Sequence, residues 1–77
     1  MGEFIVVIGL GILGQLTVQL LKANGCIVAG IDPDTKRLET ALSNGMDFAI
    51  KKNIVSTLQK LTDGDGVDGV IITAATN

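Results

Sequence analysis

Three glycines at the spacing G-x-G-x-x-G restrict the fold of this chain more than any other feature. Gly9, Gly11 and Gly14 lie between an apolar run, Phe4 to Ile8, and an amphipathic stretch, Gln15 to Asn24. In such a strand, turn and helix, the first glycine permits a tight turn and the second lets a pyrophosphate approach the backbone. The third lets the helix pack closely on the strand, and the helix N-terminus offers free N–H groups to phosphates. The segment therefore predicts a dinucleotide-binding turn.

An acidic residue follows at the expected distance. Asp32 ends the second apolar run, about 20 residues after the glycines. A carboxylate there accepts hydrogen bonds from the ribose of NAD and repels the 2′-phosphate of NADP, so we expect NAD as the cofactor. The alternative is that Asp32 only begins the turn that contains Asp34. We expect Leu10, Ile12 and Leu13 to contribute backbone N–H groups to the same site.

Short apolar runs then alternate with amphipathic segments that end at glycine, asparagine or proline. Asp34 and Asn53 stand where a side chain can cap the helix that follows. Thr73 lies near the end of the last apolar run, where it either lines a ligand site or terminates a strand. After the first strand and helix we expect strands over Cys26 to Ile31, Met46 to Ile50 and Val67 to Ala74, and helices over Thr35 to Ser43 and from Ile54.

This alternation predicts an α/β fold, a Rossmann-like parallel sheet of four strands in the order 3-2-1-4 with three helices. In that order two helices cover one face and only the third covers the other. The last strand is apolar on both sides although it lies at an edge, which a free-standing domain normally avoids. We therefore expect residues 1–77 to be a partial, truncated domain whose partner is the remainder of a longer parent chain. For residues 1–77 on their own, we expect self-association to cover the exposed edge or face.

Composition excludes several other classes of function. The net charge is −2 and the six basic residues are scattered, so no nucleic-acid surface is indicated. The longest stretch without polar side chains, Phe4 to Gly14, is shorter than the roughly 20 residues of a membrane helix, and no signal peptide is evident, so we expect a cytoplasmic protein. A single cysteine and the absence of histidine argue against a disulfide or an ordinary zinc site.

Several segments together resemble the cofactor domain of medium-chain alcohol dehydrogenases. They include Val6 to Gly14, Gly30 to Asp32 and the turn Leu61 to Asp68. The resemblance implies an NAD(H)-dependent oxidoreductase in which Asp32 binds the adenosine ribose with help from Arg37. It also implies that zinc ligands and proton-relay residues lie in a separate catalytic domain. This chain would then bind the cofactor without turning over a substrate.

Two other classes of function compete with this interpretation. Regulatory nucleotide sensors of potassium channels and transporters resemble the same glycines and acid, but they usually carry a Gly-Asp-Ala-Thr-like loop where this chain has Phe48 to Lys52. A cofactor-free scaffold would leave Asp32 and the glycines unexplained. The sequence favours the cofactor domain over both.

Overall fold

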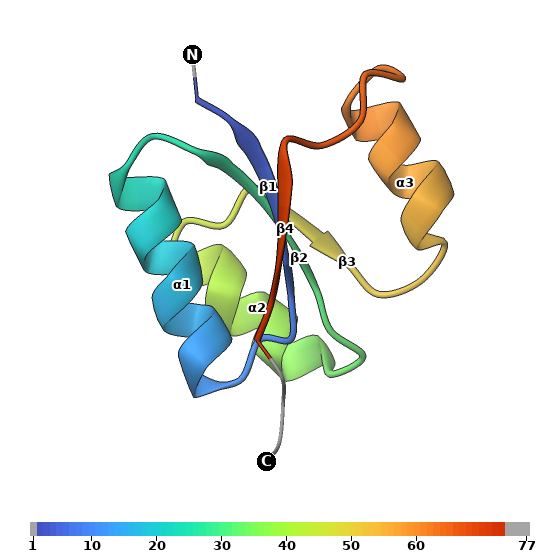
Figure 1. Ribbon diagram of the computed structural model, residues 1–77. Coiled ribbons are helices and arrows are strands. Elements are labelled where there is room, and N and C mark those ends of the chain that lie inside the picture. Colours follow the sequence, from blue (N-terminus) through green and yellow to red (C-terminus); the bar gives the residue numbers. More distant parts are fainter. Residues whose placement is uncertain (1, 74–77) are drawn as a thin grey trace.

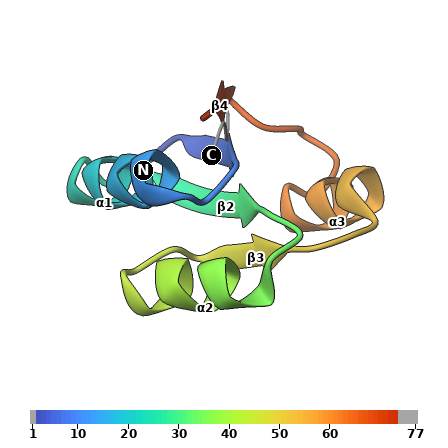
Figure 2. The same cartoon turned by 90° about the horizontal axis from the view of Figure 1, so that it is seen from below.

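The computed structural model describes residues 2–73, which form a parallel sheet with helices on both faces (Figures 1 and 2). The strands pair in the order β3-β2-β1-β4, and every pair is parallel, so the predicted fold and strand order are confirmed. Parallel neighbours cannot be joined by a tight hairpin, which is why a helix separates each strand from the next. The elements are β1 (Phe4–Ile8), α1 (Ile12–Ala23), β2 (Ile27–Ile31), α2 (Thr35–Ser43), β3 (Phe48–Ile50), α3 (Ile54–Leu61) and β4 (Gly69–Ile72).

The larger part of the core lies between the sheet and the helices α1 and α2. Side chains alternate between the faces of a strand, so Val7 of β1 points to this side together with Val28 of β2. Val18 of α1 and Leu38 of α2 pack against them. All four side chains are buried, Val7, Val18 and Val28 completely. This core holds the N-terminal ends of α1 and α2 close to the ends of β1 and β2.

The opposite face of the sheet has a thinner cover. Val6, Ala29 and Ile50 form its buried centre, and Leu58 and Leu61 of α3 pack against it while remaining partly exposed. No residue of α3 is fully buried. Figure 1 shows α3 alone on this side of the sheet, opposite α1 and α2. The expected division of the helices between the two faces is confirmed.

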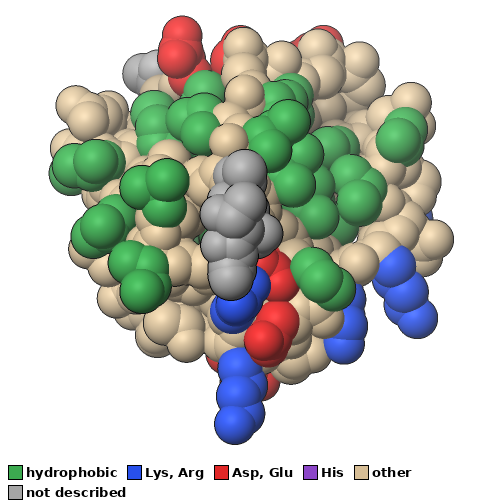
Figure 3. Space-filling model, turned by 60° about the horizontal axis from the view of Figure 1, so that its bottom comes forward, with side chains coloured by type: hydrophobic (Ala, Val, Ile, Leu, Met, Phe, Trp, Pro, Cys, Tyr) green, Lys and Arg blue, Asp and Glu red, His purple; other side chains and the backbone are tan. Residues whose placement is uncertain are grey.

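The β4 edge is apolar and exposed, as expected from the sequence. Val70 and Ile72 are 53% and 70% exposed, and Ile71 is 37% exposed. Leu16 and Leu20 of α1 are also more than half exposed. The space-filling view in Figure 3 shows many hydrophobic side chains at the surface of this small protein.

Some predicted element boundaries were wrong by one to three residues. Helix α1 begins at Ile12 instead of Gln15, so that Gly14 lies inside its first turn. Strand β2 begins at Ile27, not Cys26, and β3 begins at Phe48, not Met46. Met46 is buried instead beneath the sheet, where its sulfur occupies the space that a side chain on Gly30 would need. Strand β4 covers Gly69–Ile72, and Ala74, where it was predicted to end, lies outside the described residues.

Of the two predicted helix caps, one is confirmed and one is wrong. Asp34 has an extended backbone, and its carboxylate accepts hydrogen bonds from the N–H groups of Lys36 and Arg37. Asn53 precedes α3 but has a left-handed backbone, with φ of 57° and ψ of 47°, and its side chain makes no capping hydrogen bond. An N-cap side chain normally reaches the helix from an extended backbone, which Asn53 does not have.

A polar cluster closes the end of the sheet where β2 and β3 begin. The Asp47 carboxylate accepts hydrogen bonds from the Lys22 ammonium at 2.7 Å and from the Val28 N–H at 2.8 Å. Lys22 also donates to the carbonyl of Cys26. Burial by itself would raise the pKa of Asp47, but the hydrogen bonds from Lys22 and Val28 and the charge of Lys22 hold this pKa below its usual value of 3.8.

The lowered pKa of Asp47 predicts how its contribution to stability changes with pH. The charged carboxylate stabilises the fold above the pKa of the unfolded chain, and this contribution is lost as pH falls through the lower folded pKa. We expect Asp47→Asn to lower the free energy of unfolding by about 1 kcal/mol at neutral pH and by much less at roughly pH 2.5. Urea unfolding of both proteins at the two pH values measures this difference. An equal loss at both values would contradict the assignment.

Candidate functional site

The turn between β1 and α1 requires glycine at its first position. Gly9 has a φ of +93°, a conformation that residues with a Cβ rarely adopt. A Cβ on Gly9 would also lie 2.6 Å from the carbonyl oxygen of Thr73. The Gly9 N–H donates to the carbonyl of Ile31 at 2.9 Å, which ties the turn to the end of β2.

The other two glycines of the motif have different surroundings. Gly14 is buried in the first turn of α1, and a Cβ there would overlap the carbonyl oxygen of Gly9. At Gly14 the helix therefore approaches the turn after β1 closely enough for backbone to touch backbone. Gly11 is the N-cap of α1, and a Cβ built on it would have no atom within 4 Å. The space beside Gly11 is open to a ligand.

The first residues of α1 offer N–H groups without partners. Within residues 2–73, the N–H groups of Gly11, Ile12 and Leu13 donate to no protein acceptor. No acidic side chain lies in this first turn to neutralise the positive end of the helix dipole. The side chains of Ile12 and Leu13 are 85% and 64% exposed, so the N–H groups at this end of α1 are not buried under packed side chains. This end of α1 can bind an anion such as a phosphate.

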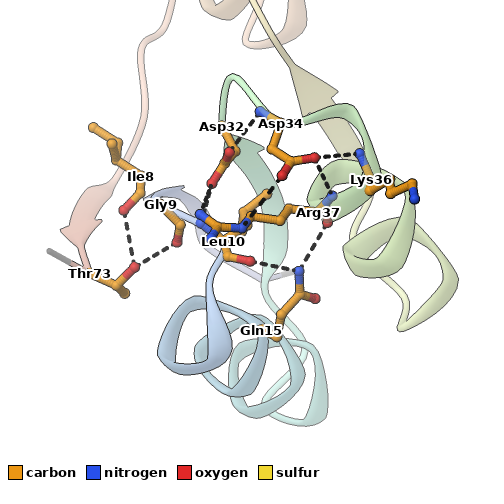
Figure 4. A network of polar contacts seen from close by, with 9 residues as sticks. All are labelled: Ile8, Gly9, Leu10, Gln15, Asp32, Asp34, Lys36, Arg37 and Thr73. Atoms are coloured by element: carbon orange, nitrogen blue, oxygen red, sulfur yellow. Dashed lines mark hydrogen bonds and ion pairs between the residues drawn. The ribbon is translucent and has the colours of Figure 1, made fainter. Parts of the chain in front are cut away.

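The carboxylate of Asp32 joins the glycine turn to the beginning of α2 (Figure 4). Asp32 is only 3% exposed. Its Oδ2 accepts a hydrogen bond from the Leu10 N–H and its Oδ1 accepts one from the Asp34 N–H, both at 2.8 Å. Each carboxylate oxygen can accept a further hydrogen bond, so the group retains capacity for a ligand hydroxyl. The turn that the sequence offered as an alternative role for Asp32 is therefore present in the structure.

Arg37 lies beside both acidic residues. Its guanidinium is 3.7 Å from the Asp32 carboxylate and 3.8 Å from that of Asp34, and the side chain is half exposed. Ion pairs of this length and exposure contribute little to stability. Arg37 can therefore move toward a ligand at small cost.

An open groove of about 290 Å³ lies between the N-terminal ends of α1 and α2. It brings Arg37, Gly11 and Ile12 together, while Asp32, which contacts Leu10 of the lining, is not itself part of it. Three further residues of the lining were not predicted from the sequence, namely Gln15, Lys36 and Thr40. Each lies one to three positions from a predicted site residue, which is the only signal that could have identified it. The full lining is Leu10, Gly11, Ile12, Gln15, Lys36, Arg37 and Thr40.

Thr73, the residue directly after β4, lies apart from this groove and supports the glycine turn. Its hydroxyl is 2.6 Å from the carbonyl oxygen of Gly9, to which it donates, and 3.2 Å from that of Ile8. The side chain is buried. The structure thus gives Thr73 a definite contact with the turn, whereas a role in lining the cofactor site stays a prediction.

Neither a metal site nor a membrane span is found in the part of the chain that the structure describes. There, no group of three histidine, cysteine, aspartate or glutamate side chains could hold a metal ion. Helices long and apolar enough to cross a membrane are likewise lacking among residues 2–73.

A parallel sheet in this order, with a glycine turn, a free helix N-terminus and an acid at the end of β2, defines a Rossmann-type nucleotide-binding unit. Comparison with known families agrees, because a model described as zinc-binding dehydrogenase matches residues 13–77. The chain belongs to this family and corresponds to the NAD-binding region of medium-chain alcohol dehydrogenase-like oxidoreductases.

Individual relatives support the same assignment. The chain is 36% identical over 77 residues to D-guloside 3-dehydrogenase of Escherichia coli, covering 95% of this chain and 22% of the relative. It is 38% identical over 72 residues to an NAD-dependent alcohol dehydrogenase of Sulfurisphaera tokodaii, covering 87% and 21%. A solved Escherichia coli oxidoreductase of unknown specificity superposes with a TM-score of 0.90 at 31% identity, covering 96% and 22%. The chain thus spans about a fifth of the length of these relatives.

The family description names zinc, but the residues of this chain do not fit a zinc site. The sequence contains no histidine and one cysteine, and its described residues form no metal-ligating cluster. No chemical role on this chain is therefore assigned to zinc.

The close contact between α1 and the glycine turn predicts effects of different size for two glycine substitutions. We expect Gly14→Ala to lower the free energy of unfolding by about 2 kcal/mol, because its Cβ overlaps a backbone oxygen that cannot move freely. Gly11→Ala, where the Cβ meets open space, should change it by less than about 1 kcal/mol. Chemical unfolding of both variants measures the difference, and equal losses would contradict the packing described for Gly14.

Thr73 gives a second test of the turn. Thr73→Val keeps the volume of the side chain but removes the hydroxyl that donates to Gly9, so we expect it to lower the free energy of unfolding by about 1 kcal/mol. Thr73→Ser keeps the hydroxyl and should lose less. The role in the turn would be contradicted if the serine variant were the less stable of the two in urea unfolding.

Proposed function

We propose that this chain binds NAD(H) over the glycine turn and along the adjoining groove between α1 and α2, as the cofactor-binding part of an oxidoreductase. The observation that supports this most is the connection between two halves of the site. The free N–H groups at Gly11, Ile12 and Leu13 suit the pyrophosphate, and the Asp32 carboxylate that suits the ribose is hydrogen-bonded to the same turn. The names of the relatives point the same way, since one is an NAD-dependent alcohol dehydrogenase.

In this proposal the residues of the chain bind and orient the cofactor. Backbone donors at the start of α1 hold the negatively charged pyrophosphate, and the dipole of α1 adds to their attraction. Asp32 accepts hydrogen bonds from the ribose hydroxyls, with Arg37 beside it at the groove. The nicotinamide, when bound, supplies hydride transfer. The reaction belongs to a longer protein, in which we propose a separate catalytic domain; a cytoplasmic location also stays a prediction.

The charges around the groove favour NAD(H) over NADP(H). Asp32 is buried, fixed by two hydrogen bonds and close to the place of the ribose, so its repulsion of a 2′-phosphate is weakly screened. Lys36 and Arg37 are exposed cations, whose attraction for the same phosphate is reduced by solvent and salt. The buried carboxylate therefore decides the preference.

Calorimetric titration of the chain with NADH and NADPH tests the proposal. We expect saturable binding of NADH, weaker binding of NADPH, and about tenfold weaker NADH binding by Asp32→Asn, because the amide loses the charge and one acceptor. The ratio of NADH to NADPH affinity should also fall in this variant. Asp34→Ser is the matched control, since serine retains an N-cap for α2 while removing a neighbouring carboxylate.

Circular dichroism and unfolding of each variant separate loss of binding from loss of fold. Absence of NADH binding by the folded wild-type chain would contradict the proposal. Binding of ATP or ADP in its place would favour the regulatory sensor. An NADH to NADPH ratio that Asp32→Asn leaves unchanged would contradict the role given to Asp32.

A further inference from the structure

The side-chain amide of Gln15 contacts both walls of the groove, although no role in cofactor binding has been given to it. It lies in the first turn of α1, directly after the last glycine of the motif. Its Nε2 donates to the carbonyl of Leu10 and to the carbonyl of Arg37, both at 2.9 Å. One side-chain amide therefore connects the glycine turn to α2, and Figure 4 shows it between the two.

These contacts complete a closed circuit of hydrogen bonds. On one side, the Asp32 carboxylate accepts hydrogen bonds from the N–H groups of Leu10 and Asp34. The Asp34 carboxylate in turn accepts one from the N–H of Arg37 in the first turn of α2. On the other side, Gln15 donates to the carbonyls of Leu10 and Arg37. Leu10 is thus held at its N–H by one branch and at its carbonyl by the other. The position of the turn relative to α2 is fixed at two points.

The hydrogen bond from Gln15 to the Leu10 carbonyl fixes the orientation of the Leu10–Gly11 peptide plane. In a trans peptide the C=O of one residue and the N–H of the next point in opposite directions. With the Leu10 carbonyl held by Gln15, the Gly11 N–H must point away from Gln15 and α2. Gly11 is the N-cap of α1, so the orientation of this peptide also fixes the start of the helix and the position of the N–H groups of Ile12 and Leu13.

The orientation of the Gln15 amide is itself determined. Its Oε1 is buried and has no hydrogen-bond partner among the described residues. Rotating the amide by 180° would place this oxygen against two carbonyl oxygens and lose both hydrogen bonds. The buried, unpaired acceptor is a cost of about 1–3 kcal/mol that an apolar side chain would not have. Folding stability alone therefore gives little reason for glutamine at this position.

We propose that Gln15 is a positioning residue, which holds the Leu10–Gly11 peptide so that the N–H groups of the turn face the pyrophosphate of the cofactor. This inference rests on the proposed function, because it assigns Gln15 a role in the same site. Gln15 acts through the backbone that it holds. It determines the affinity for the phosphate-containing cofactor more than it determines the stability of the fold.

Gln15→Met tests this role, with Gln19→Met as the matched control. Methionine has a similar shape but no amide. Gln19 lies on the same helix and is exposed, and its side chain makes no hydrogen bond among the described residues. We expect Gln15→Met to weaken NADH binding about tenfold, while its midpoint of urea unfolding stays close to that of the wild type. Gln19→Met should match the wild type in both measurements.

A second measurement needs no nucleotide. Amide NMR of the free proteins reports the Leu10–Gly11 peptide directly, and we expect the Gly11 resonance to move in Gln15→Met but not in Gln19→Met. We also expect Gln15→His, which restores an N–H donor, to recover part of the lost NADH affinity.

The outcomes separate this proposal from the proposed function. Normal NADH binding by Gln15→Met would overturn the role of Gln15 and leave the cofactor site intact. A large loss of stability together with unchanged Gly11 resonances would show a merely structural residue. If the folded wild type binds no NADH, the proposed function is overturned, and the role of Gln15 in cofactor binding is overturned with it. A Gly11 resonance that still moves in Gln15→Met would then show only that Gln15 orients the turn.

Discussion

Asp32 lies buried at the carboxyl end of β2 and accepts hydrogen bonds from two main-chain N–H groups that are far apart in the sequence. Leu10 belongs to the glycine turn and Asp34 to the cap of α2. A buried carboxylate is costly unless it is well hydrogen-bonded, so the turn and the cap must both remain in place. Asp32 on one side and Gln15 on the other hold the two walls of the groove between α1 and α2 together.

The glycines make this arrangement sterically feasible. Gly14 lets α1 touch the backbone at the end of β1, and Gly9 adopts the left-handed turn that leads there. Thr73 supports the turn from β4 through the carbonyl of Gly9. The close approach leaves the first N–H groups of α1 beside an open groove, and the chemistry of the site is consequently that of backbone donors positioned by three strands.

The two faces of the sheet differ in how well they are covered. Both α1 and α2 contribute buried residues to the core on their face of the sheet, whereas α3 contributes none on the other face, and the apolar residues of β4 are largely exposed. A chain of 77 residues buries a modest fraction of its surface, so this difference matters for its stability. The groove lies between the two helices of the well-packed face. The described site therefore depends on the better-formed part of the structure.

The sequence by itself determined the order of the strands, the division of the helices between the faces and the position of the glycine turn, because hydrophobic periodicity and glycine spacing are local properties. The spacing also predicted a ribose-binding role for Asp32, and the resemblance to alcohol dehydrogenases implied a helping role for Arg37. The sequence misplaced the start of α1 and the cap at Asn53, where backbone conformation depends on neighbours that are distant in sequence. The contacts of Gln15 and Thr73 were decided by the tertiary structure alone, since each joins segments that come together only when the sheet has formed. Whether a carboxylate or amide side chain hydrogen-bonds to a turn depends on where the main chain of that turn lies in the folded protein, and no local sequence pattern predicts that position.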